Sequence, residues 1–189
     1  MKKTIYVTII IGIITCACSK NVIQKELLSF IGKEIYFPKS MLLYNKGNGD
    51  IAPYSECEKS LKNTIVVFFD MGDCMSCKVN NMHEWGDIVE YCQNICNIKF
   101  IFSPKEKDIQ KLKAILNDSY LDTDVWIDES REFAINNECI PSNNNLHVFL
   151  LDANNKVVLA GDPLYNSKMW ELYKNTLDTM IALEESEPI

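Results

Sequence analysis

Clustered basic residues are missing from this 189-residue chain. Its formal net charge is −7, and no group of lysines and arginines offers a surface that could neutralise phosphates. The sequence also lacks a phosphate-cradling glycine loop, a carboxylate pair, a serine triad and any internal repeat. These absences argue against a nucleic-acid partner, and they leave a single globular domain of ordinary composition.

A long apolar run is missing as well. The run Ile5–Ile14 is too short for a confident membrane span. It follows Lys2 and Lys3, and a basic start before a short apolar segment is typical of an export signal. We therefore predict that residues 1–17 are a signal peptide and that the mature protein is exported.

Two cysteines stand at the end of this signal. Cys18 directly follows Ala17, and a small residue before a cysteine at this point resembles the lipobox of bacterial lipoproteins. Cys16 follows Thr15 and fits the small-residue rule less well. The prediction is a lipid on Cys18 that anchors the protein in the bacterial cell envelope, facing the periplasm. An ordinary or uncleaved secretory signal is the alternative.

Six further cysteines follow the signal, and disulfides can form and persist in an exported protein. Six cysteines allow 15 full pairings, so the connectivity stays open. Cys92 and Cys96 fall on the expected buried face of a helix, where cysteines behave as small hydrophobes. A structural disulfide with Cys57 or Cys139 is the alternative, and Cys139 could also act as a third redox thiol.

Residues 18–63 form a weakly patterned N-terminal extension. It contains an expected helix at Val22–Ile31 and an expected short edge strand at Glu34–Phe37. The pattern becomes regular at Thr64, where we begin a domain that covers residues 64–189. Thr64–Phe69 is a continuous β-branched and aromatic run, which is typical of a strand buried on both faces.

Helices and strands alternate after this strand. A helical period follows Cys77, and the two late strands surround Ala153-Asn154-Asn155, which predicts a hairpin. The remaining strands are expected at Ile98–Phe102, Asp124–Asp128, His147–Asp152 and Lys156–Ala160, and the helices at Lys105–Leu116, Glu129–Ile135 and Lys168–Leu183. This order implies an α/β fold with a central mixed sheet flanked by helices on both faces.

The motif Cys74-Met75-Ser76-Cys77 lies between the first buried strand and the first long helix. A C-x-x-C in that context predicts a redox site. The positive end of a helix favours the thiolate of the first cysteine, and the i to i+3 spacing brings the second thiol within bonding range. We expect Cys74 to be the exposed nucleophile and Cys77, one turn deeper, to resolve the mixed disulfide.

With these residues the chain resembles the thioredoxin superfamily, and within it the membrane-anchored TlpA/redoxin-type thiol–disulfide oxidoreductases. The likeness rests on Ile65–Phe69, on Cys74-x-x-Cys77-Lys78 and on the late hairpin, and it covers roughly Thr64 to Leu183. It implies a thioredoxin-like fold and an enzyme without a cofactor. That enzyme would exchange disulfides with cysteine-containing exported proteins, as a reductase rather than an oxidase, and would draw on a membrane electron donor.

Three positions depart from the family pattern. Asp73 replaces the usual aromatic residue, and its charge should oppose formation of the Cys74 thiolate. Met75-Ser76 replaces the common Gly-Pro, so the potential of relatives does not transfer. The family's cis-proline falls on Leu146, where a cis bond would cost about 2.5–4 kcal/mol. We therefore expect a trans peptide there and an altered substrate groove at Leu146 and His147.

Two other functions stay open at this point. The cysteine pair could be a disulfide without turnover, in a lipoprotein that serves as a binding or structural module. Alternatively, Cys74, Cys77 and His147 could together hold a soft metal. His147 is more simply read as a polar strand residue, and our main prediction contains no metal.

Overall fold

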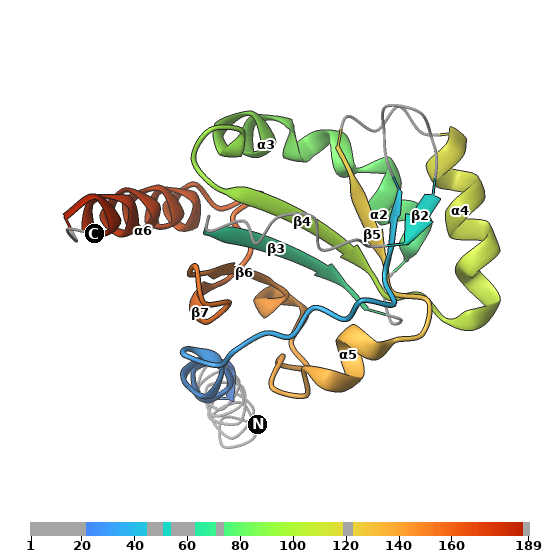
Figure 1. Cartoon of the computed structure of the whole chain (residues 1–189), viewed down its shortest axis with the longest axis horizontal. Helices are drawn as coiled ribbons and strands as arrows, with labels where there is room; N and C mark the ends of the chain where they lie inside the picture. Colours follow the sequence, from blue (N-terminus) through green and yellow to red (C-terminus); the bar gives the residue numbers. More distant parts are fainter. Residues whose placement is uncertain (1–21, 45–50, 54–62, 71–73, 119–122, 187–189) are drawn as a thin grey trace, which may run out of the picture.

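A seven-stranded sheet forms the centre of the computed structural model, which describes residues 22–44, 51–53, 63–70, 74–118 and 123–186. The strand order is β2-β1-β5-β4-β3-β6-β7 (Figure 1). The central strand β3 (Thr64–Phe69) pairs in parallel with β4 (Asn97–Phe102) and antiparallel with β6 (Val148–Leu151). The predicted mixed sheet is confirmed.

The other elements surround this centre. The remaining strands are β1 (Leu42–Tyr44), β2 (Ile51–Pro53), β5 (Val125–Ile127) and β7 (Val157–Ala160). The helices are a segment over residues 22–30, α2 (Met75–Asn80), η1 (Met82–Trp85), α3 (Gly86–Cys92), η2 (Glu106–Asp108), α4 (Ile109–Asp118), α5 (Glu132–Asn136), η3 (Asn144–Leu146) and α6 (Ser167–Ser186).

Strand β3 is continuously apolar because both faces of the sheet are covered. Ile65 and Val67 point into a first core, which includes the buried side chains of α2, η1, α3, α4 and α6. Val66 and Phe68 point into a second core with Phe30 and residues of α5. Figure 1 shows helices on both sides of the sheet, as the sequence predicts.

The single long helix expected after Cys77 is wrong, because the segment consists of α2, η1 and α3. The chain leaves the helical conformation at Asn81, whose φ and ψ are −95° and 4°. The apolar spacing survives the break, so that one side of all three pieces stays buried in the first core: Met75, Val79, Met82, Trp85, Ile88 and Cys92. Gly86 and Val89, which follow the same spacing, are exposed and half-buried respectively.

The N-terminal extension contributes directly to the fold. The expected strand at Glu34–Phe37 is wrong: within the described residues this segment makes a single bridge, between Glu34 and Lys156. The strands lie later, where β1 pairs with both β2 and β5. Phe30 and Met41 are 0% and 1% exposed in the second core. The described fold therefore starts well before Thr64.

The predicted signal peptide and the predicted lipid acceptor Cys18 lie outside the described residues. In the part of the chain that is described, no helix has the length and apolar character needed to cross a membrane.

Candidate redox site

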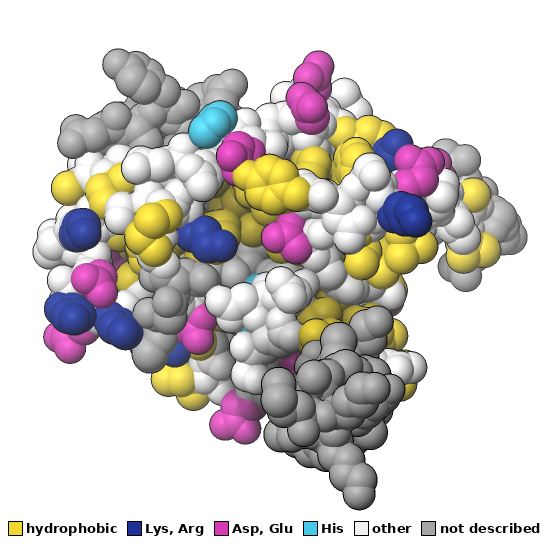
Figure 2. All heavy atoms as spheres, turned by 180° about the vertical axis from the view of Figure 1, so that it is seen from behind, with side chains coloured by type: hydrophobic (Ala, Val, Ile, Leu, Met, Phe, Trp, Pro, Cys, Tyr) yellow, Lys and Arg dark blue, Asp and Glu magenta, His cyan; other side chains and the backbone are white. Residues whose placement is uncertain are grey.

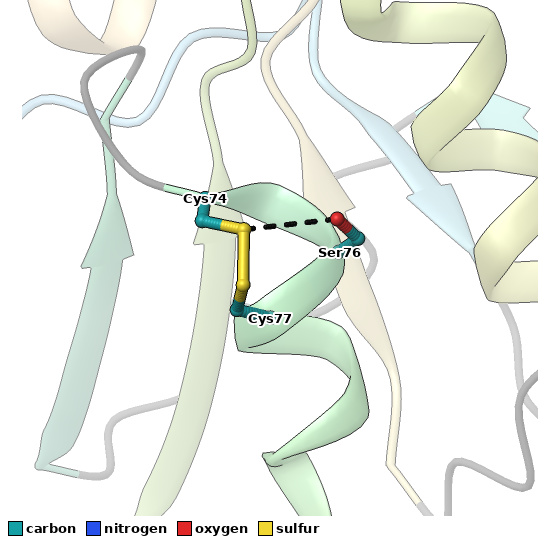
Figure 3. The surroundings of a disulfide bond; sticks show 3 residues. All are labelled: Cys74, Ser76 and Cys77. Atoms are coloured by element: carbon teal, nitrogen blue, oxygen red, sulfur yellow. Dashed lines mark hydrogen bonds between the residues drawn. A yellow bond between two sulfur atoms is a disulfide. The ribbon is translucent and has the colours of Figure 1, made fainter.

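Cys74 and Cys77 form a disulfide where β3 leads into α2 (Figure 3). Their Cα atoms are 5.3 Å apart, within the usual range for a disulfide. Cys74 is the N-cap of α2, and its carbonyl oxygen accepts a hydrogen bond of 3.0 Å from the Lys78 amide. The predicted pairing of the two sulfurs is thus present in the structure.

Both cysteines are exposed, so Cys77 is not buried behind Cys74. Helix α2 packs through Met75 and Val79, which are 9% and 2% exposed. Positions i and i+4 lie on one face of a helix. With 75 and 79 facing the core, position 77 faces away from it.

Ser76 lies beside the Cys74 sulfur. Its Oγ is 3.7 Å from Cys74 Sγ (Figure 3). A disulfide sulfur carries no hydrogen, so the hydroxyl is the donor in this contact. In the sequence, Ser76 stood out only as a departure from the usual dipeptide, although a hydroxyl between two cysteines is a visible signal for a donor.

A pocket of about 160 Å³ opens next to Cys74. One wall is the start of α2, and the other is formed by η2 and α4, with Asp108 and Lys111 supplying opposite charges. A cysteine of another molecule has room to approach Cys74 from this side. The sequence could not indicate α4 as part of the site, because α4 meets α2 only through tertiary packing.

A second pocket, of about 140 Å³, lies further along α2 and contains His147. Side chains of both charge signs and four large aromatic residues line it, among them Lys78, Glu84, Trp85, Asp162 and Tyr165. The Tyr165 hydroxyl donates to the Glu84 carboxylate. Figure 2 shows this face of the molecule hollowed near its centre, with acidic and basic side chains around apolar ones.

His147 is a buried wall of this second pocket, with 6% of its surface exposed. Its Nε2 lies 2.9 Å from the carbonyl oxygen of Pro141. Since a carbonyl oxygen only accepts, Nε2 carries the hydrogen, and in the neutral ring Nδ1 is an acceptor. This Nδ1 is buried and has no hydrogen-bond partner among the described residues.

Leu146, the other residue predicted for the groove, belongs to the second core and is 4% exposed. The short helix η3 causes this, because its turn directs Leu146 inward and leaves Asn144 on the second pocket. The expected trans peptide is confirmed: no cis bond occurs in the described parts of the chain. The groove prediction is therefore wrong for Leu146, whereas His147 does line a pocket.

The structure does not bring Cys74, Cys77 and His147 together as metal ligands. The two sulfurs bond to each other, and the Nε2 atom of His147 is engaged by Pro141. Across the described residues, no cluster of three or more cysteine, histidine or acidic side chains could hold a metal ion.

The other described cysteines are thiols. Cys92 and Cys96 are buried in the first core, as predicted for small hydrophobes. Cys139 is half-buried against the second core, and burial raises the pKa of its thiol, although Lys33 partly opposes the rise. A raised thiol pKa does not suit a third redox cysteine. Cys57 lies outside the described residues.

No protein-family model and no curated protein matches the chain. Solved structures match its fold. The C-terminal domain of a proposed thiol-disulfide oxidoreductase from Bacteroides thetaiotaomicron is 19% identical, with a TM-score of 0.51, over 80% of this chain and 98% of that domain. A proposed thiol:disulfide interchange protein DsbE from Chlorobium tepidum is 12% identical, also with a TM-score of 0.51, over 79% of this chain and 97% of the other. The chain thus has a thioredoxin-like fold.

Proposed function

We propose that this protein is a thiol–disulfide oxidoreductase that exchanges disulfides with exported proteins through Cys74 and Cys77. The carrying observation is an exposed disulfide at the junction of a central strand and a helix in a thioredoxin-like fold. The fold matches to solved proteins named as thiol-disulfide oxidoreductases add support for this class of chemistry.

The reducing direction starts from the dithiol form. The Cys74 thiolate attacks one sulfur of a target disulfide, and the other target sulfur leaves as a thiolate and takes a proton from water. The Cys77 thiolate then attacks Cys74 Sγ, which releases the second target thiolate and forms the Cys74–Cys77 disulfide. Two electrons pass to the target, and a membrane electron donor must supply two more to restore the dithiol.

The described residues assist at specific atoms. The Ser76 hydroxyl donates to Cys74 Sγ and would hold negative charge on that sulfur. The pocket shared with α4 gives the target access to Cys74. Because the Cα atoms of Cys74 and Cys77 are only 5.3 Å apart, Cys77 can resolve the mixed disulfide without any opening of the helix.

The proposal includes a lipid anchor on Cys18 that holds the domain to the bacterial cell envelope on its periplasmic side. Its support is the export-signal pattern and the Ala17-Cys18 junction. Cys18→Ser should move the protein from the membrane fraction to the soluble fraction, and Cys16→Ser should leave it in the membrane fraction. The opposite result would identify Cys16 as the anchored residue.

The deciding experiment is the reduction potential of the Cys74–Cys77 pair. The full chain is equilibrated in glutathione or dithiothreitol buffers, and its thiols are trapped by alkylation. Mass spectrometry of the tryptic peptide that contains both cysteines then gives the fractions of dithiol and disulfide. A reversible couple between roughly −300 and −120 mV is expected. Cys139→Ser, which leaves the pair intact, should give the same value.

Trapping provides the second readout. Cys77→Ser should accumulate mixed disulfides with exported proteins on Cys74, whereas Cys74→Ser should accumulate far fewer. A pair that resists reduction until the protein unfolds would contradict the enzyme and favour a binding module with a structural disulfide.

A further inference from the structure

A second pair of thiols lies in contact at the end of α3. Cys92 is the last residue of α3, and Cys96 directly precedes β4. The Cys96 amide donates a hydrogen bond of 3.0 Å to the Cys92 carbonyl oxygen, which closes one helical turn. Four residues in such a turn advance by about 6 Å. This spacing falls within the Cα separations that disulfides tolerate.

The two sulfurs are hydrogen-bonded to each other. Burial alone would raise the pKa of the Cys92 thiol, but the hydrogen bond from Cys96 outweighs it and lowers that pKa. Cys139 is the opposite case, because burial raises its pKa. Cys92 therefore has the larger tendency of the two to ionise, although Cys139 is more exposed.

The surroundings of the pair exclude most oxidants. Cys92 and Cys96 are 1% and 5% exposed, so a disulfide of another protein cannot reach either sulfur in the folded state. A small neutral oxidant remains, and a hydroperoxide is the simplest that accepts two electrons from a thiol pair.

We propose that Cys92 and Cys96 form a second redox centre, which a hydroperoxide oxidises to a disulfide independently of Cys74 and Cys77. The Cys92 thiolate attacks one oxygen of hydrogen peroxide, the O–O bond breaks, and the hydroxide that leaves takes a proton to become water. Cys92 is then a sulfenic acid. Cys96 sulfur attacks it and releases a second water, so that two thiols and one peroxide become one disulfide and two waters.

The sequence provides a direct assay. Trypsin cleaves after Lys78 and Lys99, and the peptide of residues 79–99 contains Cys92 and Cys96 and no other cysteine. The reduced full chain is exposed to hydrogen peroxide, quenched with catalase, alkylated with iodoacetamide and digested. We expect the oxidised peptide to carry no alkyl group on either cysteine and to be two hydrogens lighter than the same peptide with two free thiols. A sulfoxide on Met82 is distinguished by the mass of one added oxygen.

Two comparisons make the outcome decisive. Cys139 lies alone in the peptide of residues 132–156 and serves as the internal control. The pair should oxidise measurably faster than Cys139, because the pKa of the Cys92 thiol is lowered and that of the Cys139 thiol is raised. The Cys74→Ser/Cys77→Ser double variant should oxidise its pair at the wild-type rate, and a marked slowing there would overturn the independent centre.

Three further results would also overturn the proposal: oxidation of the pair no faster than that of Cys139, disulfide formation only in denaturant, or separate overoxidation of the two sulfurs. The Cys96→Ala variant should lose the disulfide and convert Cys92 to higher oxides. None of these readouts depends on whether the Cys74–Cys77 pair turns over.

Discussion

Ser76→Ala tests how the site stabilises a thiolate on Cys74. The Ser76 Oγ is 3.7 Å from Cys74 Sγ in the disulfide form, and it can donate to the same sulfur after reduction. A hydrogen bond of this kind contributes about 1 kcal/mol. Its loss should lower the thiolate population about fivefold at a pH below the thiol pKa.

The expected change in rate is smaller than the change in population. A thiolate of higher pKa is also a stronger nucleophile, with a Brønsted coefficient of about 0.4–0.5. About half of the logarithmic loss is therefore recovered, and Cys74 should react about two- to threefold more slowly near neutral pH.

The assay is alkylation of Cys74 by iodoacetamide in the reduced full chain, followed over pH by mass spectrometry of the peptide. Ser76→Thr keeps the hydroxyl and should stay close to the wild-type profile. An unchanged profile in Ser76→Ala would refute the reasoning, and so would an equal loss in Ser76→Thr, because the hydroxyl would then not be the cause.

Three further predictions concern the fold around the site. Tyr173→Phe removes a buried hydroxyl that donates to the carbonyl oxygens of Val148 and Gly161, at 3.1 and 3.0 Å, and should lower the free energy of unfolding by about 1–2 kcal/mol in urea titrations. Burial raises the pKa of Asp128 above its unfolded value of about 3.9, so the free energy of unfolding should fall as pH rises through the folded pKa. This fall should be absent in Asp128→Asn, and its persistence there would implicate another group. Gly161→Ala should cost about 1–3 kcal/mol because φ is 147° at this position. Adding Met169→Ala should not restore stability, since the side chain near the new Cβ is flexible; full recovery would show that contact with Met169, rather than φ, is the cause.

Local patterns carried the predictions that proved correct. Strands β3 and β6 are each buried on both faces, and such strands are visible as continuous apolar segments. The hairpin of β6 and β7 was visible from the turn residues between two apolar runs. Strands β1 and β2 were not predicted, because neither Leu42–Tyr44 nor Ile51–Pro53 has the run of β-branched and aromatic residues that made the equally short β5 visible. The break at Asn81 was also missed, since the apolar spacing continues across it.

The amino-acid sequence by itself determined the order of the strands from β3 to β7 and the place of the C-x-x-C motif after the first buried strand. These features depend on periodicity and on spacing between neighbours in the chain. Only the tertiary structure decided which side chains surround the motif. The exposure of Cys77, the inward turn of Leu146 and the position of α4 across the pocket from Cys74 all depend on how elements distant in sequence pack together, which no local pattern records.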